Sequence, residues 1–271
     1  MTEIVREQIS LPRRKEDSHK GDFGKVLLLC GSKFYTGAAF FSAQAAVNTG
    51  SGLVFLSVPE KIRPTLSQKL SEPILISRKR IPAGFNAVLA GCGLSLERSS
   101  LRLVRNQLRA NGAPLVCDAD AITLIAREKF SLISSPRELV LTPHEGEFLR
   151  LCPEFDRSRR EEFAGNFAKK NGCTLVLKGH RTVTATKSGD VFINTTGNPG
   201  MAKGGSGDIL AGIITSLIGQ GIPPERAAYI GVWLHGRAGD IAAEKYGEYA
   251  MTPSDMLESL KSAICEVERR S

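Results

Sequence analysis

The amino-acid sequence predicts an α/β fold built on a mostly parallel central sheet that carries helices on both faces. Two observations lead to this prediction. Short apolar runs, typical of buried strands, alternate along the chain with longer amphipathic segments of helical periodicity. Several short runs lead directly into glycine or aspartate, as strands of open α/β sheets do where they meet a ligand. The residues that follow the strands are therefore the first candidates for chemistry.

The predicted strands are the short apolar runs. Two late runs, 182–186 and 191–194, flank the polar turn 187–190 and predict an antiparallel hairpin near an edge of the sheet. The other strands, in chain order, are predicted at residues 25–30, 53–58, 87–90, 115–117, 139–142 and 174–177.

The predicted helices are the longer amphipathic segments between and after these runs. Gly50 is a suitable C-terminal cap for the first helix, and Thr252-Pro253-Ser254 is a typical start for the last one. The helices are predicted at residues 37–48, 97–110, 158–170, 206–218, 224–245 and 254–268. The sequence contains no repeat or linker, so we expect one domain over residues 1–271, with residues 1–18 as a loose N-terminal segment.

Composition limits the classes of partner. Lys and Arg number 36 against 28 Asp and Glu, which gives a formal net charge of +8. Such a charge fits an ordinary solvated surface or a surface that attracts small polyanions. The basic residues are dispersed and no aromatic-basic module occurs, so no nucleic-acid binding is expected.

The cysteines and the apolar runs indicate the compartment. The six cysteines form no CxxC pair and lie mostly in apolar runs, as reduced buried thiols do. No signal-peptide core is present, and no apolar run approaches the ~20 residues of a membrane helix. We therefore expect a cytoplasmic protein without membrane association. His19, His180 and His235 show no metal-ligand spacing, so no structural metal site is predicted.

Residues 197–210, GNPGMAKGGSGDIL, are the most informative stretch. They lead into a helix with one apolar stripe, which places Gly204, Gly205 and Gly207 at a helix N-terminus. Free N–H groups and the helix dipole make such a terminus an anion site. Asp208 in the first turn is either a dipole-favoured helix start or a general base beside a bound phosphate. Neither a GxxxxGK[ST] nor a GxGxxG loop occurs, so phosphate recognition is of another kind.

Several segments together resemble one protein family. Residues 197–208 resemble the anion-binding loop of the ribokinase-like superfamily and, in full length, that of its NAD(P)H-hydrate dehydratases. Similar family motifs are HKGDFG at 19–24, YTGA at 35–38 with GSGLV at 50–54, AGCGL at 90–94, DADA at 118–121, LTPHEGE at 141–147 and KGHRT at 178–182. The resemblance spans residues 19–265. Lys203, Ser206 and Ile122 stand where the family has threonine, threonine and leucine.

The resemblance implies a ribokinase-like three-layer fold and an ADP-dependent (S)-NAD(P)H-hydrate dehydratase. Such an enzyme uses ADP, or ATP, to convert hydrated NADH and NADPH (NADHX and NADPHX) back to the cofactors. ADP is the expected donor, with Mg²⁺ bridging its phosphates and no dedicated protein cage for the ion. A separate NAD(P)HX epimerase would be the functional partner, and a homotetramer is the expected assembly.

The resemblance also implies roles for individual residues. Asp208 would take the proton of the substrate hydroxyl, within a catalytic loop formed with Gly205, Ser206 and Gly207. The hydrated nicotinamide nucleotide would be bound by Gly37, Ala38, Gly93, His144 and Asp208. The nucleotide would be bound by Lys178, Gly179, His180, Arg181, Thr182 and Gly207. Without the family, a lone histidine such as His144 is more often a structural or capping residue, and a basic turn that enters the hairpin is an alternative interpretation of Lys178 and its neighbours.

Two other functions remain open at this stage. A kinase of the same fold could phosphorylate a vitamin precursor or a sugar hydroxyl, and the glycine loop alone does not exclude it. A non-catalytic nucleotide sensor is the other alternative, which the intact Asp208 and glycine nest disfavour.

Overall fold

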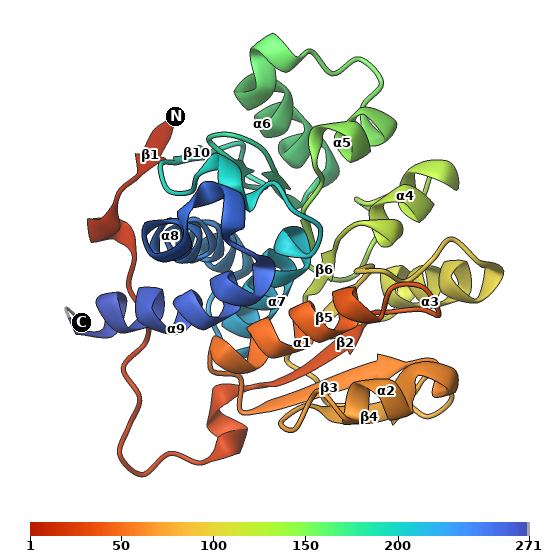
Figure 1. Ribbon diagram of the computed structural model, residues 1–271. Helices are drawn as coiled ribbons and strands as arrows, with labels where there is room; N and C mark the ends of the chain where they lie inside the picture. Colours follow the sequence, from red (N-terminus) through yellow and green to blue (C-terminus); the bar gives the residue numbers. More distant parts are fainter. Residues whose placement is uncertain (270–271) are drawn as a thin grey trace.

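The central sheet contains every strand found in residues 1–269, the part of the chain that this computed structural model describes. Its ten strands lie in the order β1-β10-β9-β8-β7-β6-β5-β2-β3-β4 (Figure 1). Neighbouring strands are parallel except for the pairs β8–β9 and β9–β10, which confirms the predicted α/β fold with a mostly parallel sheet. The strands are β1 Thr2–Ile4, β2 Lys25–Leu29, β3 Leu53–Val58, β4 Ile74–Ser77, β5 Ala87–Ala90, β6 Leu115–Cys117, β7 Leu139–Leu141, β8 Thr174–Leu177, β9 Val183–Ala185 and β10 Val191–Asn194.

The N-terminal residues form the edge of the sheet beside the hairpin. β1 pairs in parallel with β10, so the predicted β9–β10 hairpin is not itself the edge. Ile4 and Ile9 are buried, and the Arg6 guanidinium donates to the backbone carbonyl of Glu266 at 2.8 Å. Part of the segment expected to be loose is therefore packed against the body of the protein, because two apolar side chains and one charged anchor hold it there.

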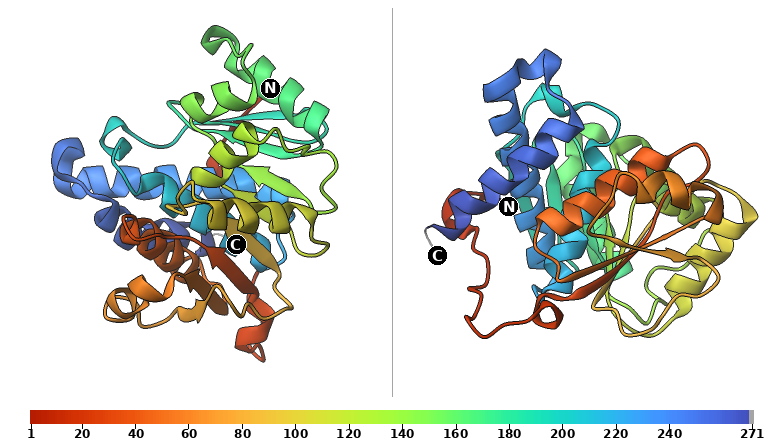
Figure 2. Two further views of the ribbon diagram at one scale, coloured as in Figure 1. Left: turned by 90° about the vertical axis from the view of Figure 1, so that its right-hand side faces the viewer. Right: turned by 60° about the horizontal axis from the view of Figure 1, so that its bottom comes forward.

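Helices cover both faces of the sheet. Figure 2 shows the C-terminal helices, in blue, and the helices coloured yellow to green on opposite sides of the strands. α1, α7, α8 and α9 pack against one another on one face, and α3 to α6 lie on the other. The helices are α1 Thr36–Asn48, α2 Arg63–Ser67, α3 Arg98–Arg109, α4 Asp120–Arg127, α5 Glu145–Leu151, α6 Arg160–Asn171, α7 Ser206–Gly219, α8 Pro224–Ala250 and α9 Pro253–Glu268.

Strand β2 shows why its sequence is continuously apolar. Successive side chains of a strand point to opposite faces, and both faces of this sheet are covered. Val26 and Leu28 therefore join the core under α1, α7, α8 and α9, whereas Leu27 and Leu29 join the core under α3 to α6. All four side chains are at most 2% exposed.

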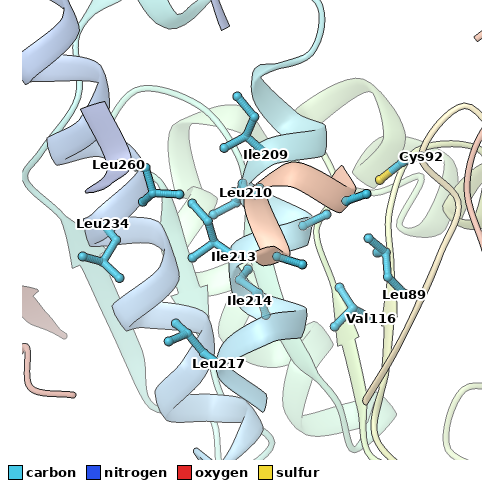
Figure 3. Close-up of a cluster of buried hydrophobic side chains, with 14 of the residues drawn as sticks. Leu89, Cys92, Val116, Ile209, Leu210, Ile213, Ile214, Leu217, Leu234 and Leu260 are labelled. Atoms are coloured by element: carbon cyan, nitrogen blue, oxygen red, sulfur yellow. The ribbon is translucent and has the colours of Figure 1, made fainter. Parts of the chain in front are cut away.

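Helix α7 is buried on nearly every side, not along one stripe as its apolar spacing predicted. Its Ile209, Ile213 and Leu217 face the core together with Leu234 of α8 and Leu260 of α9 (Figure 3). The small residues on its other side are buried as well, because α1 packs closely there. A helix enclosed in this way is apolar all round.

Gly212 is the point of closest approach between α7 and α1. A Cβ atom at this position would lie 2.3 Å from the backbone oxygen of Ser42, which cannot move without displacing α1. We expect Gly212→Ala to lower the free energy of unfolding by about 1–3 kcal/mol, as overpacking of a core does. Urea denaturation measures this. Gly204→Ala is the control, because a Cβ there meets no atom within 4 Å; an equal loss in both variants would contradict the packing argument.

The remaining differences from the sequence prediction concern short elements. β1, β4, α2, α4 and α5 were not predicted; all are short, and β1 and β4 contain exposed residues in place of a continuous buried apolar run. The other elements begin and end within a few residues of the predicted bounds. Among the described helices, none is both long and apolar enough to span a bilayer.

Candidate active site

Four chain segments meet at the carboxyl ends of the central strands. Cys92 follows β5, Asp118 follows β6, Lys178 follows β8 and Asp208 lies in the first turn of α7. One ligand atom each of Cys92, Asp118 and Asp208 lies within 4.8 Å of the others. The Lys178 Nζ atom lies 2.7 Å from Oδ1 of Asp118. This edge therefore gathers two carboxylates, a thiol and an ammonium group.

The glycine loop delivers Asp208 to this cluster. Gly205 is the N-cap of α7 and has φ of 107°, in the left-handed region that favours glycine. A Cβ at Gly205 would lie 2.8 Å from Cε2 of Phe41 in α1, so a side chain there is excluded by space as well. The chain turns sharply at Gly205 and α7 begins at once. Its first N–H groups are the anion-binding end of the helix.

Asp208 has the electrostatics of a base that works near neutral pH. The pKa of its carboxyl is raised to about 7, by burial first and by the charge of Asp118 second, although a hydrogen bond from Cys92 and the charge of Lys178 act in the opposite direction. A carboxylate with a pKa near the working pH is both available as a base and basic enough to take a proton. Strongly perturbed carboxyls of this kind concentrate at functional sites.

Lys178 connects the ends of three strands. Its Nζ pairs with Asp118 at 2.7 Å and lies 3.9 Å from Oε2 of Glu147, while the Thr142 hydroxyl donates to Asp118 at 2.8 Å. Burial alone would lower the pKa of Lys178, but the charges of Asp118 and Glu147 raise it above its ordinary value. The ammonium also lies beside the start of α7, since a Cβ at Gly207 would be 3.3 Å from Nζ. Lys178 thus reaches the anion-binding end of α7 while it neutralises two buried carboxylates.

His144 caps helix α5. Its Nδ1 accepts a hydrogen bond from the backbone N–H of Glu147 at 3.2 Å, and the backbone N–H of His144 donates to the Glu147 carboxylate at 2.9 Å. The backbone of His144 forms an isolated parallel β-bridge with that of Lys178, so His144 lies at the same edge of the sheet. The structure gives His144 the capping role that the sequence left open, and its imidazole stays 56% exposed.

The small residues predicted at the substrate site pack together. Gly93 has φ of 57°, and a Cβ there would lie 2.5 Å from Cβ of Tyr35 and 2.8 Å from Cβ of Ala38. At Gly37 a Cβ would meet only the Phe41 ring, at 4.0 Å. Gly93 therefore lets the loop after β5 approach the start of α1, and Gly37 borders open space beside it.

Residues 179–182 form a tight turn between β8 and β9. The Thr182 hydroxyl donates to the Gly179 carbonyl at 2.9 Å, and Arg160 donates to the His180 carbonyl at 2.8 Å. The Arg181 guanidinium is paired with Glu3 of β1. The backbone of this turn is thus firmly held, while the imidazole of His180 is exposed.

Lys203 is tied to the end of α8. Its Nζ donates to the backbone carbonyl of Tyr249 at 2.8 Å and to that of Met251. Both carbonyls lie just beyond Gly247, where the helical geometry of α8 is interrupted. In this arrangement Lys203 anchors the glycine loop to the α8–α9 connection.

His235 was not predicted as part of the site. Burial lowers the pKa of its imidazole to about 4, so the ring is neutral at physiological pH. Its Nε2 lies 2.9 Å from the Ser206 carbonyl and 3.1 Å from the Ser206 hydroxyl. A carbonyl only accepts, so Nε2 carries the proton and fixes Ser206 at the start of α7. The only signal in the sequence was one polar residue inside the apolar run of α8.

The donors at this edge do not fit a resident magnesium ion. Among residues 1–269 one group of possible ligands gathers here: Cys92, Asp118 and Asp208. Mg²⁺ requires a near-octahedral set of oxygen ligands, and a thiol is a poor ligand for it. Oδ1 of Asp118 is already bonded to Thr142 and Lys178. This donor set therefore does not suit a catalytic magnesium ion held by the protein alone.

Several proteins resemble this chain over most of its length. Residues 26–262 match the family described as NAD(P)H-hydrate dehydratase. The bifunctional NAD(P)H-hydrate repair enzyme Nnr of Moorella thermoacetica is 40% identical over 277 residues, which cover 95% of this chain and 52% of the relative. The chain thus spans about half the length of such bifunctional relatives. The ADP-dependent (S)-NAD(P)H-hydrate dehydratase of Neisseria meningitidis is 35% identical over 86% of this chain and 82% of its own.

Solved structures show the same relationship. The ADP/ATP-dependent NAD(P)H-hydrate dehydratase of Bacillus subtilis, co-crystallised with ATP and Mg²⁺, superposes with a TM-score of 0.90 at 28% identity and covers 98% of both chains. The hydroxyethylthiazole kinase of Pyrococcus horikoshii gives a TM-score of 0.61 at 18% identity over 93% of both chains, which shows a shared fold alone. With its fold, its glycine loop and a family match over residues 26–262, this chain belongs to the NAD(P)H-hydrate dehydratase family.

Proposed function

We propose that this protein is an ADP-dependent (S)-NAD(P)H-hydrate dehydratase. The observation that carries the proposal is the Asp208 carboxyl, whose pKa is raised to about 7 at the anion-binding start of α7. A base and a phosphate-binding backbone in one helical turn suit the activation of a hydroxyl for phosphoryl transfer. The names of relatives such as the Neisseria meningitidis enzyme support ADP as the phosphate donor.

In the first step Asp208 takes the proton of the hydroxyl on C6 of the hydrated nicotinamide ring. The hydroxyl oxygen attacks the terminal phosphorus of ADP, and the bond between that phosphorus and the bridging oxygen of AMP breaks. Gly205 and Gly207 are proposed to present backbone N–H groups to the transferring phosphoryl group, and His235 holds Ser206 between them through its carbonyl and hydroxyl.

In the second step the C6–O bond of the new ester breaks and phosphate leaves, while the neighbouring ring carbon loses a proton to water and the electrons of its C–H bond form the ring double bond. Hydroxide is a poor leaving group, whereas phosphate is a good one, and this difference is the reason for spending a nucleotide. The balanced outcome is that hydrated NADH and ADP give NADH, AMP and phosphate. Hydrated NADPH reacts in the same way.

The nucleotide is assigned to the β8–β9 turn and the start of α7. Lys178 lies beside Gly207, and the turn 179–182 is held by Arg160. Gly179, His180, Arg181 and Thr182 are proposed to line the nucleotide with their backbone. Mg²⁺ would bind to the nucleotide phosphates, retain most of its waters and neutralise phosphate charge.

The substrate is assigned to the opposite side of Asp208. Gly37, Ala38 and Gly93 are proposed to let the hydrated nicotinamide approach the backbone, with His144 at the edge. An NAD(P)HX epimerase is the proposed functional partner, because it supplies the S epimer. We further propose a homotetramer in the cytoplasm.

Absorbance at 340 nm after addition of purified protein to hydrated NADH tests the function. With Mg²⁺ and ADP or ATP in separate cuvettes, we expect a rise with ADP that is absent without nucleotide. A faster rise with ATP would overturn the assignment of the donor. No rise with either nucleotide, together with a stable phosphoester formed from a vitamin precursor, would replace the dehydratase by a kinase.

A further inference from the structure

The Cys92 thiol lies close to the carboxylates of both Asp118 and Asp208. Its sulfur donates to Oδ2 of Asp118 at 3.5 Å and belongs to the group within 4.8 Å that includes Asp208. The side chain is fully buried. This thiol is not a packing residue alone, since its polar neighbours include oxygens of both carboxylates as well as the Cys30 thiol.

The backbone fixes the position of this thiol. Gly91 has φ of 131°, and a Cβ there would lie 1.8 Å from the backbone oxygen of Asp118. On the other side, Gly93 is pressed against Tyr35 and Ala38. The turn 91–93 is therefore wedged between the loop after β6 and the start of α1, and Cys92 has little freedom to move away from Asp118.

The thiol keeps its proton. A hydrogen bond with Cys30 and then burial raise the pKa of Cys92 well above its ordinary value. Ionised carboxylates only accept hydrogen bonds, and Oδ1 of Asp118 is already bonded to Thr142 and Lys178. Besides its contact with Cys30, the protonated Cys92 thiol is thus a donor within reach of Oδ2 of Asp118 and of Asp208.

The other groups that act on Asp208 are charged. Asp118 and Asp120 repel its negative charge, and Lys178 attracts it. Glu147 faces Lys178, and His235 at the start of α7 is neutral. Two carboxylates that approach each other in a buried site need a donor between them, or one of them stays protonated.

We propose that Cys92 is a positioning residue whose thiol proton is shared by Asp118 and Asp208 and holds the Asp208 carboxylate in place as the base. The inference rests on the proposed function of Asp208. Loss of the donor removes a hydrogen bond from the ionised form of Asp208 and leaves it facing Asp118 directly. Proton transfer then requires a higher pH.

Cys92→Ala and Cys92→Ser test this inference. Ser keeps a donor of similar size, and Ala removes it. Cys173→Ala is the control, because Cys173 is a buried thiol in the core between α6 and β8 and away from the carboxylates. The first measurement is the pH dependence of kcat. We expect the acidic limb to move up by about one pH unit in Cys92→Ala and to stay in place in Cys92→Ser and Cys173→Ala.

The second measurement needs no turnover. In protein labelled with ¹³C at the aspartate carboxyl carbons, the Asp208 signal, assigned by its absence in Asp208→Asn, reports its titration directly. We expect the same upward shift in Cys92→Ala alone. Unchanged titration in a folded Cys92→Ala, or an equal shift in Cys92→Ser, would overturn the role of the thiol. Absence of dehydration in the wild type beside the expected titration shifts would instead overturn the proposed function.

Discussion

Asp208→Asn is expected to lose at least about 100-fold in kcat and to retain nucleotide binding, since removal of a general base costs about that much. The amide has the same shape but cannot accept the hydroxyl proton. Rates from the absorbance assay and ADP binding by calorimetry measure the two effects. Turnover at the wild-type level would exclude Asp208 as the base.

The pH dependence of the wild type follows from the same carboxyl. We expect kcat to rise with pH through an apparent pKa of about 7, because only the ionised form accepts a proton. The rise should be absent in the residual activity of Asp208→Asn.

The same substitution should stabilise the fold above neutral pH. The folded pKa of Asp208 is raised above its unfolded value, so the unfolded chain gives up this proton at lower pH than the folded protein. Stability is therefore lost as pH rises from about 4 to about 7, and it stays reduced at higher pH. Asp208→Asn removes that cost, and we expect a higher Tm than the wild type at pH 8 and little difference at pH 4. A lower Tm at pH 8 would contradict the burial argument.

Lys178→Met is expected to lower the free energy of unfolding by about 3–5 kcal/mol, as loss of one partner of a buried ion pair does. The side chains of Lys178, Asp118 and Glu147 are 18%, 2% and 8% exposed, so water cannot replace the lost ammonium. Met retains most of the volume of the lysine side chain, so the variant removes the charge with little change in packing. Urea denaturation gives the free energy.

Lys187→Met is the matched control. Lys187 pairs with Glu138 at 2.9 Å, but both side chains are more than half exposed, so its loss should cost at most about 1 kcal/mol. The double variant Lys178→Met with Asp118→Asn should recover part of the stability, because one stranded charge is removed. A cost in Lys178→Met no larger than that in Lys187→Met would refute the buried pair.

The sequence predicts much of this fold because its main elements are long or strongly apolar. The strands that become β3, β5, β6 and β8 begin and end where their apolar runs do. β1 and β4 could not be found in this way, since they are short edge strands with exposed residues, and β1 pairs with β10 far along the chain. α7 was expected to bury one stripe, and only tertiary packing against α1 shows why small residues cover its other side.

The sequence predicts the site residues that lie in one continuous stretch, but not those that come together from distant parts of the chain. The glycine loop and Asp208 lie in one stretch, so the glycines, the acidic residue and the apolar periodicity after them identify the start of an anion-binding helix. Cys92 and Asp118 are separated by 26 residues, and Asp118 and Lys178 by 60. Their proximity depends on the order of strands in the sheet, which no local pattern contains. For the same reason, the pairing of Lys178 with Asp118 could not be anticipated from its basic turn.

The central position of α7 has a consequence for the folding of the chain during its synthesis on the ribosome. α7 begins at residue 206 and packs on α1, β2 and β5, all of which are synthesised long before it. Until it emerges, the apolar face of α1 and the part of the sheet that α7 covers stay exposed. β1 likewise waits for β10 to complete its pairing. The nascent chain therefore carries exposed apolar surface through most of its synthesis, and its folding is coupled to the appearance of a single late helix.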